Sequence, residues 1–298
     1  MLSIIIVSYN THDLLDQCLA SIETHCHDAE VIVVDNGSKD ASCELVRNKY
    51  PKTKLVEANA NLGFARANNS GIEKSSGDYV LLLNSDTVLE DDSLSRCVQF
   101  MDANPKLGAI SPSLIGIDDQ PQRAYHAFPT MRARVARAFS HNAETRIPEP
   151  GETGWLAGTA LMIRREALND IGGTLDRDYR MYWEDADTSA ELLEKGWEVA
   201  EFTDAHIRHY GGASGGGPDA ARRSDLYAHY AWGEHRWFCK HRPLIESAMV
   251  WTLDFLDLFR KTLRGLIRPS RRSELTHARV LGRVLMWRII GRRPPIPG

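Results

Sequence analysis

The chain has 298 residues, 43% of them apolar and 26% charged, so it can bury a sizeable core and has the composition of an ordinary soluble globular protein. This composition excludes a disordered chain, and no uncharged run approaches the ~20 residues that a membrane-spanning helix needs. The five cysteines form no CxxC pair, which argues against a disulfide framework or a zinc site and is typical of a reducing cytoplasm.

The first hundred residues alternate apolar runs with helical patterns. Strands are predicted for LSIIIVSY, EVIVVD, TKLVEA and DYVLLL; the first of these is too short, and lacks the basic leader, for a signal peptide. Helices are predicted between them, for example from Phe64 to Lys74. Continuous Val, Ile and Leu strands between helices indicate an α/β fold with a parallel sheet covered on both faces.

Ligands of such sheets bind beyond the carboxyl ends of the strands. Three polar segments are predicted to meet there: Ser8-Tyr9-Asn10, Asp35-Asn36-Gly37-Ser38 and Asn84-Ser85-Asp86. The first turn carries no GxGxxG and no GxxxxGK[ST], and no GxSxG follows later. A dinucleotide fold, a P-loop and a nucleophile elbow are therefore not expected.

Beyond residue 105 the regular alternation is lost. GWLAGTALMIRREAL predicts a strand followed by a helix that ends at Gly172-Gly173, and EVAEF predicts a short strand. Between them, MYWEDADTSAELLEKGW predicts a helix that Gly196 closes. Its acids follow two aromatic residues, which leaves two interpretations. The segment is a well-capped surface helix, or one of its carboxylates is held in an apolar pocket to take a proton.

A metal site is one interpretation of Asp86 and His209. Asp86 follows an apolar strand, and Mg²⁺ or Mn²⁺ prefers such oxygen ligands, shared with substrate phosphates. His209 precedes the glycine-rich HYGGASGGGPD segment and would suit Mn²⁺ better than Mg²⁺. The plain alternatives are a turn at Asp86 and a solvated histidine.

Taken together, the motifs resemble family 2 glycosyltransferases. IIIVSYN, VIVVDNGSKD, NLGFARANNSGI, DYVLLLNSDT, GWLAGTALMIRREAL, YWEDADTSAELLEKGW and HYGGAS occur in that family's order over residues 2 to 215, and are most similar to its rhamnosyltransferase-like branch. The resemblance implies a GT-A fold, a nucleotide-sugar donor, a divalent metal and transfer with inversion. A processive polymerase is less expected, because no QxxRW motif is present.

The resemblance also implies roles for individual residues. Asp185 matches the catalytic base, and Asp86 is the last acid of a metal motif that reads NSD here, with His209 as a further metal ligand. The donor-binding residues would be Ser8, Tyr9, Asn10, Asp35, Asn61, Arg66, Asn69, Asn84 and Ser85. Trp155, Gly158, Tyr182, Trp183 and Glu184 would contact the acceptor, with a helix-opening or structural role as the alternative for Glu184 and a buried packing role for Trp155. Residues Gly211 to Gly217 would be a donor-ordered lid or only a linker.

We expect a glycosyltransferase domain over 1–215, with a nucleotide-binding half at about 1–105 and an acceptor half at about 106–215, and a helical extension over 216–298. From residue 258 onward there are eleven basic residues against one acid, so this tail carries +10 and the preceding part −14. Residues Pro243 to Arg268 predict an amphipathic helix, and Ser273 to Ile290 a second helix.

An anionic membrane is the favoured partner of this tail, with packing on the domain or a homodimer as alternatives, and nucleic acid is not expected. The protein would then be cytoplasmic and peripheral at the inner face of the membrane. Two classes of function remain: an inverting transferase with dTDP-rhamnose or a UDP-sugar as donor and a glycan or polyprenyl-linked acceptor, or a non-catalytic binding protein of the same fold.

Overall fold

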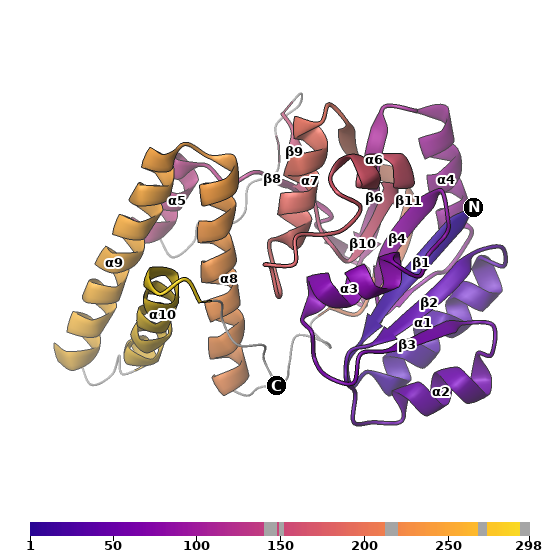
Figure 1. Ribbon diagram of the computed structural model, residues 1–298, viewed down its shortest axis with the longest axis horizontal. Coiled ribbons are helices and arrows are strands. Elements are labelled where there is room, and N and C mark those ends of the chain that lie inside the picture. Colours follow the sequence, from indigo (N-terminus) through magenta and orange to yellow (C-terminus); the bar gives the residue numbers. More distant parts are fainter. Residues whose placement is uncertain (140–147, 149–151, 212–219, 268–272, 293–298) are drawn as a thin grey trace.

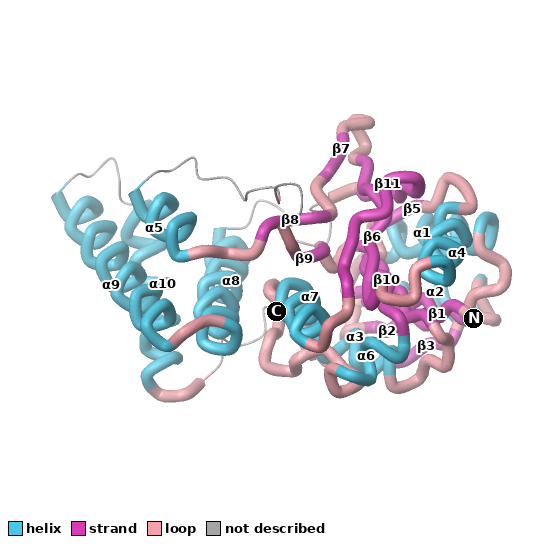
Figure 2. Tube along the Cα trace, turned by 90° about the horizontal axis from the view of Figure 1, so that it is seen from above, coloured by secondary structure: helices cyan, strands magenta, loops and turns pink. Residues whose placement is uncertain are grey.

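The computed structural model describes residues 1–139, 148, 152–211, 220–267 and 273–292. Within these residues a nine-stranded sheet with helices on both faces forms the larger part of the molecule, and a group of helices stands beside it (Figures 1 and 2). The predicted boundary at residues 215 and 216 lies outside the described residues, as does most of the predicted lid.

The elements follow the predicted order. The strands are β1 (Leu2–Ser8), β2 (Glu30–Asp35), β3 (Lys54–Glu57), β4 (Tyr79–Asn84), β5 (Thr87–Val88), β6 (Leu107–Ile115), β7 (Pro121–Gln122), β8 (Tyr125–Ala127), β9 (Gly154–Leu156), β10 (Ala160–Arg164) and β11 (Glu198–His209). The helices are α1 (His12–His25), α2 (Ser42–Lys49), α3 (Phe64–Ile72), α4 (Ser93–Ala103), α5 (Met131–Phe139), α6 (Arg165–Asp170), α7 (Glu184–Glu194), α8 (Ala220–His241), α9 (Leu244–Ile267) and α10 (Ser273–Ile289).

The sheet has a parallel half and a mixed half. Its order is β3-β2-β1-β4-β10-β6-β11-β5, and the first four strands are parallel, with Ile5 in register with both Ile32 and Leu82. β10 enters antiparallel between β4 and β6, whereas β11 runs parallel to β6. The α/β class is thus confirmed, and the alternation is lost after residue 105 because the chain reverses within the sheet. β11 is also longer than the predicted EVAEF strand.

Two apolar layers hold the sheet. On one face Ile4 and Ile6 belong to an apolar cluster with residues of α1, α2 and α4, and on the other Ile5 belongs to a second cluster with residues of α3, α6 and α7; all three isoleucines are fully buried. Adjacent strand residues point to opposite faces, so an uninterrupted apolar run serves both layers. This packing leaves the carboxyl ends of β1, β2 and β4 together at one edge of the sheet.

The helices α5, α8, α9 and α10 form what we call the helical unit. Its interior contains an ionic network: the Asp254 carboxylate of α9 accepts hydrogen bonds from Arg134 of α5 and from Nη1 of Arg288 of α10, the latter at 2.6 Å. Glu234 of α8 completes the network, 3.3 Å from Arg134 Nε. The Asp254 and Arg288 side chains are only 5% and 2% exposed, so four helices are tied together by charges in the unit's interior.

The amphipathic helix predicted after Pro243 is confirmed as α9, but its apolar side faces outward. Its exposed residues, which we call the outer face of α9, are Leu244, Ile245, Ala248, Met249, Thr252, Phe255, Leu256, Phe259, Leu263, Leu266 and Ile267. No charged residue is among them. Among the described residues, none of the helices is long and apolar enough to span a bilayer.

Candidate active site

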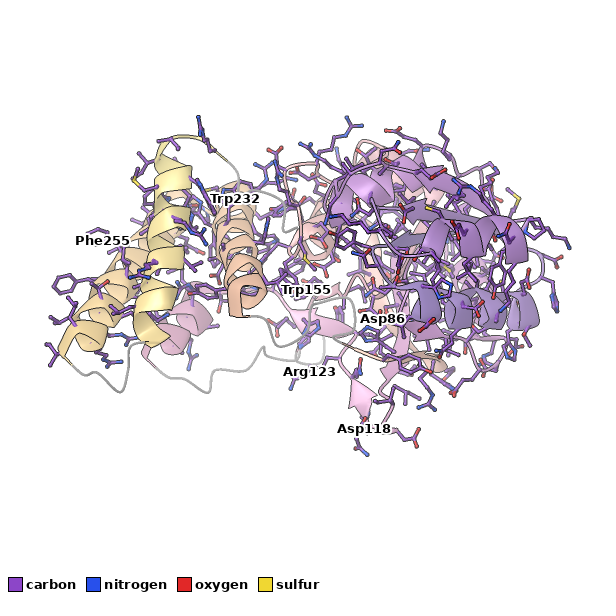
Figure 3. All side chains as sticks on the ribbon, turned by 90° about the horizontal axis from the view of Figure 1, so that it is seen from below. Asp86, Asp118, Arg123, Trp155, Trp232 and Phe255 are labelled. Carbon is purple, nitrogen blue, oxygen red and sulfur yellow. The ribbon has the colours of Figure 1, made fainter. Side chains whose placement is uncertain are left out.

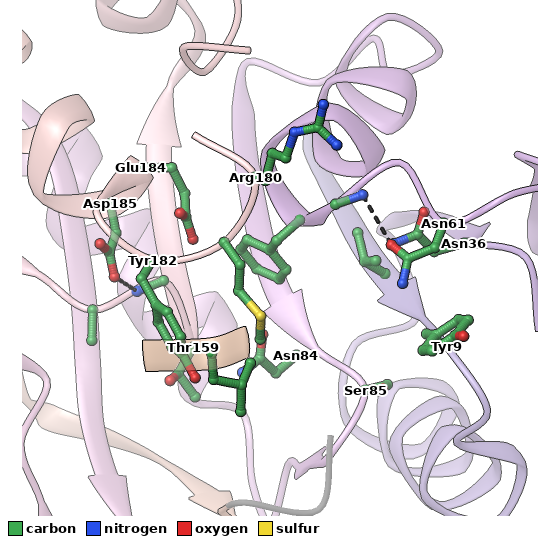
Figure 4. A pocket seen from close by; sticks show the side chains of 17 residues that line it. Tyr9, Asn36, Asn61, Asn84, Ser85, Thr159, Arg180, Tyr182, Glu184 and Asp185 are labelled. Atoms are coloured by element: carbon green, nitrogen blue, oxygen red, sulfur yellow. Dashed lines mark hydrogen bonds between the residues drawn. The ribbon is translucent and has the colours of Figure 1, made fainter. Parts of the chain in front are cut away.

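A cavity of about 250 Å³ opens at the carboxyl ends of β1, β2 and β4. Figure 4 shows Glu184 and Asp185 on one side of this cavity and Tyr9, Asn36 and Asn61 on the other. The complete lining comprises Val7, Tyr9, Asn36, Asn61, Gly63, Phe64, Asn84, Ser85, Ala157, Gly158, Thr159, Arg180, Met181, Tyr182, Glu184, Asp185 and Leu226. Segments far apart in the sequence therefore meet here.

Asp185 lies in the first turn of α7 and faces the cavity. Its Oδ2 accepts a hydrogen bond from the Gly158 N–H at 2.9 Å, and its Oδ1 accepts one from the Ala186 N–H at 2.8 Å. The side chain is partly exposed, yet the protein around it raises the pKa of the Asp185 carboxyl above its ordinary value by desolvating the charge. A carboxylate fixed in this way, with a raised pKa, suits a group that takes a proton.

Glu184 precedes Asp185 and also lines the cavity, but it is buried, and its Oε2 has no hydrogen-bond partner. Burial, followed by the nearby charge of Asp185, holds the pKa of the Glu184 carboxyl well above its usual value. Burial therefore opposes the charged form more strongly at Glu184 than at Asp185.

The third acid of this helix, Asp187, is fully buried behind the cavity. Its carboxylate binds Lys240 Nζ at 2.7 Å and His241 Nε2 at 2.8 Å, both from α8. Nearby, Arg236 of α8 binds Asp176 at 2.7 Å. These contacts dock the helical unit against the sheet domain, so we interpret Asp187 as a structural acid.

The two aromatic residues in front of α7 have different surroundings. Both have left-handed backbones, with φ of +68° at Tyr182 and +75° at Trp183, a strained conformation for such side chains. Tyr182 lines the cavity, whereas Trp183 is buried in an aromatic cluster with Trp237 of α8. Trp155 lies outside the lining too: it stacks on His126 at 4.4 Å and donates Nε1–H to the Ala127 carbonyl.

The strained segment is fixed by the N-terminal end of α3. The Phe64 N–H donates to the Arg180 carbonyl at 2.6 Å, and Gly63 has φ +83° with space for no side chain, because a Cβ would lie 2.5 Å from that same oxygen. The buried Asn69 amide bonds both backbone groups of Leu175, and Arg66 Nε donates to the Arg177 carbonyl. Arg66 and Asn69 thus lie outside the cavity lining and hold the segment in place, and the donor contact expected of them stays a prediction.

The predicted donor residues fall into two groups. Tyr9, Asn61, Asn84 and Ser85 line the cavity, and Asn61 Oδ1 accepts from the Asn36 amide at 3.1 Å. The others lie behind them. The buried Ser8 hydroxyl pairs with Thr11, and Asn10 Oδ1 accepts from the Lys39 N–H.

Asp35 belongs to this second group and is also buried. Its Oδ2 accepts from the Gly37 and Ser38 N–H groups, while its Oδ1 has no hydrogen-bond partner. A buried acceptor without a partner costs free energy, so this oxygen is suited to an N–H donor of a ligand, such as that of a pyrimidine base.

Asp86 and His209 are brought together by the pairing of β5 with β11, in which His209 is in register with Thr87. Asp86 is 1% exposed, both of its carboxylate oxygens lack a hydrogen-bond partner, and its Oδ1 lies 3.4 Å from His209 Nε2. On the other side of the ring, His209 Nδ1 contacts Oε1 of Gln122 at 2.7 Å, and an amide oxygen can only accept, so Nδ1 carries the proton. Nε2 is the ring nitrogen that faces Asp86.

This arrangement fits a divalent cation, because both buried Asp86 oxygens lack a hydrogen-bond partner and a ring nitrogen of His209 faces one of them. Among the described residues, no group of three or more His, Cys, Asp or Glu side chains could hold a metal. Asp86 and His209 would therefore need oxygen ligands from the substrate's phosphates or water to complete a coordination shell, which is the usual situation for Mg²⁺ and Mn²⁺ at nucleotide sites.

Sequence reasoning missed several residues of the site. Arg180 supplies a guanidinium to the lining, and Gln122 sets the His209 tautomer. Neither lies in a periodic or motif-bearing segment. Asn36 was predicted at this edge of the sheet, within the polar segment after β2, but it was given no role in donor binding.

Comparison with known proteins identifies the class. The sequence profile of glycosyl transferase family 2 matches residues 3–172, more than half of the chain. The chain belongs to this family and is a glycosyltransferase, as the motifs predicted.

Two curated relatives bear on the particular activity. The chain is 28% identical over 301 residues to an N-acetylglucosaminyl-diphospho-decaprenol L-rhamnosyltransferase of Mycobacterium tuberculosis, covering 92% of this chain and 97% of the relative. It is 32% identical over 212 residues to a poly-beta-1,6-N-acetyl-D-glucosamine synthase of Staphylococcus epidermidis, covering 67% of this chain and 46% of the relative.

Solved structures confirm the GT-A fold. A mannosyltransferase from Pyrobaculum calidifontis, in complex with GDP-mannose and Mn²⁺, superposes with a TM-score of 0.57 at 18% identity, over 98% of this chain and 88% of that one. Residues 1–349 of TarS from S. aureus give a TM-score of 0.54 at 15% identity, over 98% and 92% of the two chains.

Proposed function

We propose that this protein transfers a sugar from a nucleoside-diphosphate sugar to a hydroxyl group of a glycan or lipid-linked glycan, with inversion at the anomeric carbon. Rhamnose from dTDP-rhamnose is the favoured donor sugar, because the relative that matches over nearly its whole length is a rhamnosyltransferase acting on a lipid diphosphate. UDP-sugars come next. The product would belong to a surface polysaccharide or a cell-wall linkage.

The observation that carries this proposal is the position of Asp185 across the cavity from the carboxyl ends of the parallel strands (Figure 4). A donor whose nucleotide binds beside Tyr9, Asn36 and Asn61 would direct its sugar toward Asp185. The acceptor oxygen would then attack the anomeric carbon as the bond to the diphosphate breaks, and its proton would pass to Asp185.

The charge on the leaving diphosphate needs stabilisation. Asp86 and His209 would hold a divalent ion there, and Mn²⁺ or Mg²⁺, when bound, neutralises charge on the diphosphate. Arg180 lines the cavity and would supply a positive charge. Tyr182 and Glu184 are placed to contact the acceptor, and Gly158 orients the base through its N–H.

The arrangement of the chain supports a working division. We propose residues 1–215 as the transferase domain and 216–298 as its extension, with α5 reaching from the former into the helical unit. Since the proposed acceptor is lipid-linked, we place the protein in the cytoplasm, peripheral to the inner face of the membrane.

Release of nucleoside diphosphate from a panel of donors, measured with Mn²⁺ and with an undecaprenyl- or decaprenyl-diphosphate-sugar acceptor, tests the proposal. Acceptor-dependent release from one donor is expected, with dTDP-rhamnose the first candidate. Binding of a donor without turnover under any acceptor condition would leave only the alternative of a non-catalytic binding protein and would refute the proposal.

A further inference from the structure

The outer face of α9 is the most apolar surface of the described chain. Of the fourteen large hydrophobic side chains that are exposed, nine lie on α9 and three at the end of α10 (Met286, Ile289 and Ile290). Met1 and Ile117 are the other two. Phe255 and Phe259 are 62% and 63% exposed, and Figure 3 shows Phe255 projecting from the side of the helical unit away from the sheet. A patch of this size marks an interaction site.

The orientation of α9 is set by its own charges. The Asp254 carboxylate is held inside the unit by Arg134 and Arg288, and Asp257 pairs with Arg260 at 2.8 Å and with Lys261 at 2.7 Å. Turning the apolar face inward would expose this network and break it. The helix therefore keeps its ionic side inside and its hydrocarbon side outside, the reverse of an ordinary surface helix.

The chemistry of the outer face distinguishes between possible occupants. A protein partner is normally met by an apolar centre with a polar, hydrogen-bonding rim. Over the 24 residues of α9, about 36 Å at 1.5 Å per residue, the only polar side chain on the outer face is Thr252, and its hydroxyl already donates to the Ala248 carbonyl. Such a surface has nothing left to hydrogen-bond, which suits hydrocarbon.

Basic residues accompany the apolar surface. On α10 the exposed Arg279 and Arg283 lie one helical turn apart, and Met286 and Ile290 continue the same stripe toward the C-terminal end. Arg292 is exposed just beyond it. Arg260, Lys261 and Arg288 are paired with Asp257 and Asp254, so the exposed arginines at 279, 283 and 292 are the described cations that complement an anionic headgroup layer.

We propose that the outer face of α9 lies in the plane of an anionic phospholipid bilayer, with its phenylalanine and leucine side chains among the acyl chains and the arginines of α10 at the headgroups. The exposed residues of α9 include no charged side chain, so none of the side chains on this face has a charge to desolvate. The choice of a bilayer as the occupant rests on the proposed function, since a lipid-linked acceptor is found in a bilayer. The observation of an exposed apolar face on α9 does not depend on that function.

Vesicle co-sedimentation of the full-length protein tests this proposal. Vesicles of phosphatidylglycerol and phosphatidylethanolamine should bind the native protein more tightly than phosphatidylcholine vesicles, and added salt should narrow that difference. The double substitution Phe255→Ser, Phe259→Ser should lower the partition coefficient by about 100-fold, roughly tenfold for each aromatic side chain removed. Ile117→Ser is the matched control: Ile117 is 64% exposed in the turn between β6 and β7, and its change should have no effect.

Two further readouts make every outcome decisive. Transfer to a short, soluble acceptor analogue should be the same for the native protein and the double variant, so a failure of the proposed function would appear there and not in sedimentation. Light scattering gives the oligomeric state. Equal vesicle binding by the native protein and the double variant would overturn the proposal, and so would a native dimer that the double substitution converts to monomer.

Discussion

Exchanging the two neighbouring acids of α7 for their amides separates their roles. In Asp185→Asn the proton acceptor is lost, and a positioned general base typically contributes about 10²- to 10⁴-fold, or roughly 3–5 kcal/mol of the barrier. Burial favours the neutral form of the Glu184 carboxyl by raising its pKa, and Glu184→Gln places a neutral amide at the same position. We therefore expect Asp185→Asn to lose turnover by at least about 100-fold and Glu184→Gln to keep most of it.

The stability cost of Asp185→Asn can be worked from its contacts. The carboxylate accepts from two N–H groups, those of Gly158 and Ala186, whereas an asparagine has one carbonyl oxygen and leaves one donor without a partner. That loss is about 1–3 kcal/mol, partly offset because an amide carries no charge to desolvate. Each kcal/mol lowers the melting temperature by about 2–4 °C in a domain of 150–250 residues. The variant should remain folded.

The assay combines three measurements on both variants: nucleotide release in single-turnover and steady-state conditions, donor affinity by calorimetry, and melting temperature. Donor affinity should survive in both. The reverse order, with Glu184→Gln inactive and Asp185→Asn active, would assign the base to Glu184. Near-normal turnover in both would remove this pair of acids from the chemistry.

Three further predictions concern proton transfer, the metal and the helical unit. Turnover of the native enzyme should fall as the pH is lowered through the raised pKa of Asp185, because only the ionised carboxylate accepts a proton; donor binding that falls in parallel would point to another group. Gln122→Ala frees the His209 ring and should weaken Mn²⁺ affinity, read by titration of Mn²⁺-dependent donor binding, by about 10–100-fold; an unchanged affinity would remove His209 from the metal site. Asp254→Ala leaves the buried Arg288 without its carboxylate partner and Arg134 with Glu234 alone, and it should lower the free energy of unfolding in urea by about 3–5 kcal/mol. As a control, Asp92→Ala removes an exposed partner of Arg96 and should lower the free energy of unfolding by under about 1 kcal/mol. Equal losses of stability in the two variants would contradict the account.

The sheet and its polar edge could be predicted from the sequence because both follow from local patterns. Apolar runs with turn residues after them specify strands, and parallel strands bring their carboxyl ends together, so Tyr9, Asn84 and Ser85 were predicted at one edge. The antiparallel position of β10 beside β4 was not predicted, because strand order depends on contacts between residues far apart in the sequence.

The other differences between the predicted and the observed structure also arise from contacts between residues far apart in the sequence. A helical wheel gives the two faces of α9 but cannot say which one packs, and Asp254 decides this through arginines on α5 and α10. Likewise Trp183 looked like an acceptor residue, but it belongs to an aromatic cluster with α8. Arg180 and Gln122 act through tertiary neighbours that no spacing reveals.

The most direct measurement is the crystal structure of the protein with a non-transferable donor analogue, Mn²⁺ and an acceptor fragment. It should show the Asp185 carboxylate within about 2.6–3.2 Å of the acceptor hydroxyl, on the side of the anomeric carbon opposite the diphosphate, with Asp86 and His209 binding the metal. A carboxylate on the diphosphate side, or one pointing away from the sugar into solvent, would contradict transfer with inversion by this residue.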